Sequence, residues 1–104
     1  MNTITALHNQ KEIQVHQWRV AQWISEIPRS DYIFSKIKIA CRDIDTRPYK
    51  SSKPQRIDPY KLLLHACGSS ERFTPSEIHI GILREALNAV NRIMLSEIKA
   101  IRGT

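Results

Sequence analysis

The last third of the chain contains the pattern that most restricts how this sequence can fold. Thr74-Pro75-Ser76-Glu77 places a hydroxyl at an N-cap, Pro at the first helical position and Glu at the third. Together these residues satisfy the free amides of a helix start. No Pro follows the motif, and Gly81 is the only Gly before Gly103. The sequence therefore predicts a helix from 75 to about 101, roughly 40 Å long.

Apolar residues cover an unusually wide part of this predicted helix. At about 100° per residue they occupy an arc of roughly 200°, which is more than one neighbouring helix covers. The helix therefore lies at the centre of a bundle, or it buries one edge against a second copy as a homodimer. The residues of such a protein interface would be Ile78, Ile82, Leu83, Val90 and Met94.

A second long helix is expected near the start of the chain. Asn9-Gln10-Lys11-Glu12 fits a capping box, and Ile13, Val20 and Trp23 follow at helical spacing before Pro28 ends the pattern. We therefore predict a helix over 10–27, preceded by a flexible N-terminus over 1–8.

Two shorter helices are predicted between the long ones. The first opens with Ser30 as N-cap and carries apolar residues from Ile33 to Ile44. Ile37, Ile39 and Cys41 also alternate as they would in a strand, but no second strand is available to pair with it. The next helix covers 59–67, where Asp58-Pro59 forms an N-cap and first turn and Gly68 follows as the C-cap residue.

These elements predict an all-α fold, a single domain over 1–104 built as a small bundle of three to four helices. The chain has 41% hydrophobic and 25% charged residues, which are the proportions of an ordinary globular domain. We expect the first and last helices to form a long antiparallel framework, with the two shorter helices packed across it. A basic loop that contains Pro and Ser, over 46–57, joins the shorter helices.

This basic loop is the most distinctive candidate for binding. Arg47, Lys50, Lys53 and Arg56 recur at every third residue, with Tyr49 among them. In a polyproline II conformation this spacing would align four cations about 9 Å apart, as a ladder along a phosphate backbone. Tyr49 would be free to stack on a base. The alternative is a solvated linker whose charges keep it open.

Charge is concentrated around the same loop. The whole chain has a net charge of +6. Residues 36–61 contain eight Lys or Arg and three Asp, a net of +5, so the other 78 residues contribute only +1. We therefore predict that nucleic acid or an acidic protein surface binds this segment. Its contacts would include three cations that flank the loop, Lys36, Lys38 and Lys61.

A protein-interaction module (an adaptor, an inhibitor or an assembly subunit) is the second functional hypothesis. Trp18 lies on the first helix with Val15, away from the apolar stripe that contains Trp23. Either this helix is buried on two sides, or Trp18 is an exposed anchor for a partner, as aromatic residues often are. In the latter case Trp18 would extend the interface predicted on the last helix.

The sequence contains no pattern for catalysis, a cofactor or a metal. GxGxxG, P-loop, HExxH and GxSxG motifs are all absent, so we predict no catalytic residues, no enzyme activity and no small-molecule substrate. His8, Glu12 and His16 have helical metal-ligand spacing, but His16 lies at the edge of the apolar face. Asp43-Ile44-Asp45 is flanked by Arg42 and Arg47, which we expect to neutralise it.

The remaining features predict a cytoplasmic protein that does not enter a membrane. No apolar segment precedes Lys11, as a secretory signal would require, and the longest apolar run is Leu62-Leu63-Leu64. Cys41 and Cys67 are too few for a disulfide scaffold, so we expect both thiols to be buried, reduced and inert.

Overall fold

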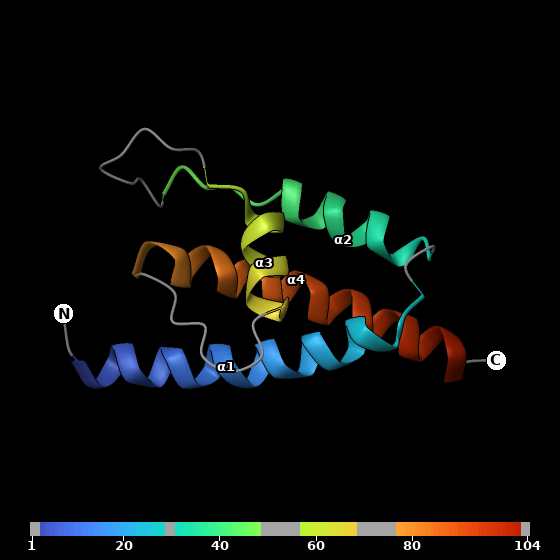
Figure 1. The fold of residues 1–104 in the computed structure, drawn as a ribbon, viewed down its shortest axis with the longest axis horizontal. Helices are drawn as coiled ribbons and strands as arrows, with labels where there is room; N and C mark the ends of the chain where they lie inside the picture. Colours follow the sequence, from blue (N-terminus) through green and yellow to red (C-terminus); the bar gives the residue numbers. More distant parts are fainter. Residues whose placement is uncertain (1–2, 29–30, 49–56, 69–76, 103–104) are drawn as a thin grey trace.

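The structure, a computed structural model, describes residues 3–28, 31–48, 57–68 and 77–102. Among these residues there is no strand, so the predicted all-α bundle with long first and last helices is confirmed. The four helices, labelled in Figure 1, are α1 (Thr3–Glu26), α2 (Ile33–Arg42), α3 (Pro59–Gly68) and α4 (Glu77–Arg102).

The first helix begins earlier than its sequence pattern indicated. α1 starts at Thr3, so Asn9 lies inside the helix and does not cap it. The predictions of a capping box at Asn9 and of a helix start at residue 10 are therefore wrong, and α1 begins within the 1–8 segment. No Pro or Gly lies between Thr3 and Asn9 to stop the helix, and Asn costs less than about 1 kcal/mol in a helix interior.

The segment that could have been a strand is helix α2. Its buried residues are Ile33, Ile37 and Cys41, four positions apart, as a helix with one face against the core requires. The backbone N–H of Ile33 donates to Oδ1 of Asp31 at 3.1 Å, so Asp31 supplies an acceptor for a free amide at the start of α2. The predicted cap, Ser30, lies outside the described residues.

The start of α3 agrees with its prediction. Oδ1 of Asp58 accepts a hydrogen bond from the backbone N–H of Tyr60 at 3.0 Å, and Pro59 is the first helical residue. The side-chain amide of Gln17 on α1 donates to the carbonyl oxygen of Ala66, which ties the far end of α3 to α1. The cap motif predicted for α4, at Thr74-Pro75, lies outside the described residues.

The two long helices run in the same general direction, so the predicted antiparallel framework is wrong. In Figure 1, α1 and α4 both run from left to right, and α2 lies along α4 in the opposite direction. α3 crosses the bundle, and the chain therefore enters α4 in the direction of α1. The prediction assumed a strict up-and-down alternation of four helices, which a crossing helix removes.

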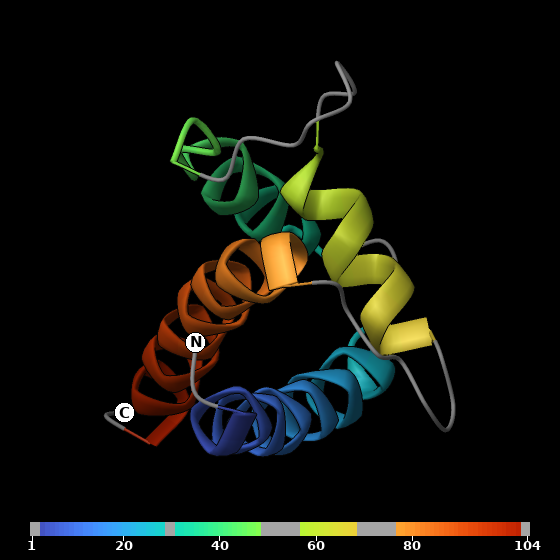
Figure 2. The ribbon, with the colours of Figure 1, turned by 90° about the vertical axis from the view of Figure 1, so that its left-hand side faces the viewer.

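α4 is central to the bundle, which explains its wide apolar arc. In the described part, α3 and α4 each contact every other helix, and α1 and α2 do not contact each other. The end-on view in Figure 2 shows the four helices around this shared interior. The residues that α4 contributes to the core cluster are Leu83, Ala86, Leu87 and Val90.

Burial inside the monomer removes most of the protein interface predicted on α4. Ile82, Leu83 and Val90 are fully buried, and Met94 is 5% exposed. That part of the interface prediction is therefore wrong, because three helices of the same chain cover the arc that a second copy was expected to cover. The Ile78 side chain lies outside what the structure describes.

Trp18 is an exposed residue of α1. Its exposed fraction is 70%, and that of Val15, one turn earlier, is 61%. Trp23 and Ile24 instead pack against the core. Of the two alternatives for Trp18, the structure therefore excludes burial on a second side of the helix by its own chain.

No helix within the described ranges is long and apolar enough to span a bilayer.

Candidate polyanion-binding site

Five of the eight cations in the basic segment lie among the described residues, and they have different surroundings. These are Lys36, Lys38, Arg42, Arg47 and Lys61. The other predicted contacts, Tyr49, Lys50, Lys53 and Arg56, lie outside the described residues.

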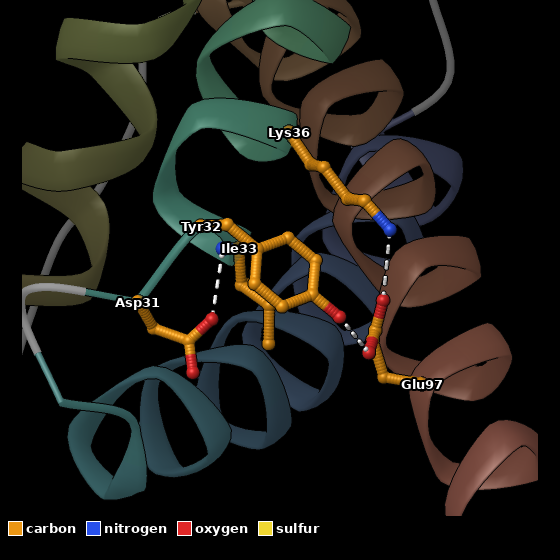
Figure 3. Close-up of polar contacts among 5 residues, drawn as sticks. All are labelled: Asp31, Tyr32, Ile33, Lys36 and Glu97. Atoms are coloured by element: carbon orange, nitrogen blue, oxygen red, sulfur yellow. Dashed lines mark hydrogen bonds and ion pairs between the residues drawn. The ribbon is translucent and has the colours of Figure 1, made fainter.

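Lys36 is held by a carboxylate of α4. Its Nζ is 3.0 Å from Oε1 of Glu97, and the hydroxyl of Tyr32 donates to Oε2 of the same carboxylate at 2.8 Å. The ammonium also lies 4.8 Å from the centre of the Tyr32 ring. Figure 3 shows the Lys36 ammonium and the Tyr32 hydroxyl both pointing toward the carboxylate of Glu97. Lys36 therefore helps to position α2 on α4, and it is not part of the binding site that we propose below.

The Glu97 contacts predict a pH-dependent contribution to stability. The hydrogen bonds from Lys36 and Tyr32 hold the pKa of Glu97 below the ordinary value of 4.5. The folded state therefore binds this proton less readily than the unfolded state, so the contribution is complete above pH 4.5 and is lost as the pH falls through the lowered pKa.

We expect Glu97→Gln to remove part of the acid sensitivity of the fold. In urea titrations, the free energy of unfolding should fall less steeply with decreasing pH in this variant than in the wild type. Glu85→Gln, a change of an exposed carboxylate on the same helix, is the control and should keep the wild-type slope. Equal slopes for all three proteins would contradict the role of Glu97.

Arg47 is engaged by a neighbouring carboxylate. Its Nε and Nη2 donate to the two oxygens of Asp45 at 2.9 and 3.0 Å, and its backbone N–H donates to Oδ1 at 3.0 Å. The side-chain hydrogen bonds lower the pKa of Asp45. The expectation that Arg47 neutralises the Asp43-Ile44-Asp45 motif is therefore confirmed for Asp45.

Lys38 and Arg42 have no carboxylate partner among the described residues. They lie one turn apart on α2, both are exposed, and both line a pocket of about 430 Å³. The Nζ of Lys38 is 5.9 Å from the centre of the Tyr60 ring, so a cation of α2 lies over an aromatic ring of α3. Within the described residues, these two cations line one pocket without an ion pair, so together they can accept an external anion.

The other lining residues of the pocket come from the start of α3 and from the chain that follows α2. They are Ile57, Asp58, Pro59 and Tyr60 at the start of α3, and Ile44 and Thr46 after α2. The 49–56 segment, with its three cations, begins after Pro48 and rejoins the described chain at Ile57, beside the pocket. Lys61 is exposed on α3, immediately after Tyr60, and makes no ion pair within the described residues.

Of the residues that line this pocket, the sequence prediction named only Lys38, and it missed both Arg42 and Tyr60. Arg42 follows Lys38 by four residues, which places both on one helical face, and this spacing could have identified it. Tyr60 belongs to the pocket only because α3 packs against α2, and no local pattern indicates that contact.

A smaller pocket between α1 and α4 offers no metal site. Glu12, His16, Arg84 and Asn88 contribute its polar lining. Nη2 of Arg84 is 3.6 Å from Oε2 of Glu12, so the guanidinium of Arg84 already occupies the position beside this carboxylate that a metal cation would need. Within the described residues, no three potential ligands from His, Cys, Asp and Glu come together. The His8 side chain lies outside the described part.

Comparisons of the chain with protein-family models, with curated proteins and with solved structures found no match.

Proposed function

We propose that this chain is a non-enzymatic binding protein for nucleic acid or another polyanion. The observation that carries the proposal is the pair Lys38 and Arg42, which line one pocket without a carboxylate partner in the described residues. Lys61 and the cations of the 49–56 segment would extend the contact. Cations that are not neutralised by the protein gain most from binding phosphates, because they release counterions.

Two charge-neutralising variants test the proposal. We expect Lys38→Gln/Arg42→Gln to weaken binding to a labelled single strand of roughly 20 thymidines about tenfold in low salt, measured by fluorescence anisotropy. The matched control is Arg92→Gln/Lys99→Gln, which removes two exposed cations of α4 and gives the same net charge.

The comparison separates a local site from a general charge effect. The control variant should stay within about twofold of the wild type, because its cations lie on a different helix from the pocket. Equal losses in the two variants would mean that net charge alone governs binding. No binding by the wild type to the single strand, to duplex DNA or to heparin would overturn the proposal.

A protein-interaction role is the second candidate, and the exposure of Val15 and Trp18 favours it. A large aromatic residue at 70% exposure next to an exposed Val is typical of an interface anchor. We place this candidate on the outer face of α1, which could form a homodimer or bind another protein. Sedimentation velocity tests the homodimer: a monomer at all micromolar concentrations would contradict it.

A further inference from the structure

The pocket beside α2 has two chemically different walls. Lys38 and Arg42 supply positive charge on the α2 side. Ile57, Pro59 and the Tyr60 ring supply apolar surface on the α3 side. Ile57 is half-buried and lies outside the core cluster of the described residues, so part of this apolar surface remains open to a ligand.

The carboxylate of Asp58 limits what this pocket can accept. One of its oxygens already accepts the N–H of Tyr60, and the residue lines the same pocket as the two cations. Its charge disfavours a second phosphate, while its remaining acceptor capacity suits a hydroxyl or amine donor. A volume of about 430 Å³ lies within the range of small-ligand pockets.

From these features we infer that the pocket binds one nucleotide of a single-stranded nucleic acid. The inference rests on the proposed polyanion binding and specifies its ligand. One phosphate lies against Lys38 and Arg42, the base or sugar lies against Ile57 and Tyr60, and Asp58 accepts a hydrogen bond from a sugar hydroxyl or a base N–H.

Other polyanions match the pocket less well. Heparin supplies negative charge but no planar apolar group for the Ile57 side. The bases of a duplex are stacked and paired, so they reach a pocket only after strand separation. A single strand offers both phosphates and unstacked bases, which proteins commonly bind through cations and apolar or aromatic side chains.

Two uncharged variants test the pocket separately from charge. Ile57→Asn removes apolar surface, and Thr46→Met narrows the pocket; both keep the net charge at +6. We expect each variant to bind the single strand about fivefold more weakly than the wild type and to bind heparin within about twofold of it. Far-UV circular dichroism and thermal melting of each variant establish that it is folded before binding is compared.

NMR titration of the folded wild type supplies a readout that needs no variant. Adenosine 5′-monophosphate should shift the amide signals of Ile57 and Tyr60 as well as those near Lys38 and Arg42. Inorganic phosphate should shift only those near the two cations.

If the protein binds single strand, duplex and heparin equally and neither uncharged variant changes single-strand binding, the pocket inference is wrong and the polyanion proposal stands. If the wild type binds none of them, the proposed function itself fails.

Discussion

Leu83→Ala should lower the free energy of unfolding by about 2–5 kcal/mol, the largest loss of stability that we expect from a single change. The Leu83 side chain has no exposed surface and belongs to the core cluster. Truncation leaves a cavity that the surrounding helices only partly fill. Because small domains have a total stability of about 5–15 kcal/mol, this loss should lower the Tm by about 10 °C or more.

Leu95→Ala is the matched control for this effect. Both changes replace the same residue type on α4, so helix propensity cancels, but Leu95 is 50% exposed. The control should cost about 1 kcal/mol or less in a urea titration. Similar losses in the two variants would contradict the central position of α4 in the monomer and would reopen the possibility that a second copy covers its apolar face.

The two thiols should react at least about tenfold more slowly in the folded protein than in the unfolded chain at pH 8, and Cys41 more slowly than Cys67. Burial raises the pKa of Cys41 and of Cys67 from 9.0 to about 11, which lowers the thiolate fraction about 100-fold, and the greater nucleophilicity of the more basic thiolate offsets only part of this loss. The Cys41 side chain is fully buried and Cys67 is half-buried. The measurement is the rate of reaction with an aromatic disulfide reagent, with and without guanidinium chloride.

Variants with a single thiol allow the reaction rates of Cys41 and Cys67 to be measured separately. In Cys67→Ala the remaining Cys41 should react only as fast as the protein opens, whereas Cys67 in Cys41→Ala should react sooner. Rapid labelling of Cys41 in the native state would mean that its side chain is not enclosed as described. That result would also count against the proposed binding site, because Lys38 and Arg42 lie on the same helix as Cys41.

Much of the helical structure could be predicted from local patterns. Asp58-Pro59 defined the start of α3 because both its cap and its fixed backbone angle act within one turn. The four-residue spacing from Ile33 to Cys41 favoured a helix over a strand for a similar reason. These signals arise between residues that are close along the chain, so they can be recognised in the sequence alone.

Relationships between helices could not be predicted in the same way. The wide apolar arc of α4 was compatible with burial in its own chain or against a second copy, and only the packing of three helices around Leu83 and Val90 excludes the second choice there. The direction of α4 relative to α1 depends on α3 crossing the bundle, for which no residue pattern exists.

The candidate site illustrates the same division. Counting charges identified the basic segment as a candidate region, but the count treated all cations as equivalent. The packing of α2 against α4 pairs Lys36 with Glu97, and a local turn pairs Arg47 with Asp45. Lys38 and Arg42 are left unpaired among the described residues, and contact with α3 gives them an apolar wall at Tyr60.

The salt dependence of binding tests the central claim most directly. The claim is that Lys38 and Arg42 together form the anion-binding centre of this protein. For the single strand, the plot of log affinity against log salt concentration should be less steep in Lys38→Gln/Arg42→Gln than in the wild type, by about 0.7, which corresponds to the one phosphate that the two cations hold together. Arg92→Gln/Lys99→Gln should keep the wild-type slope. A slope that the Lys38/Arg42 change leaves unaltered would contradict the account.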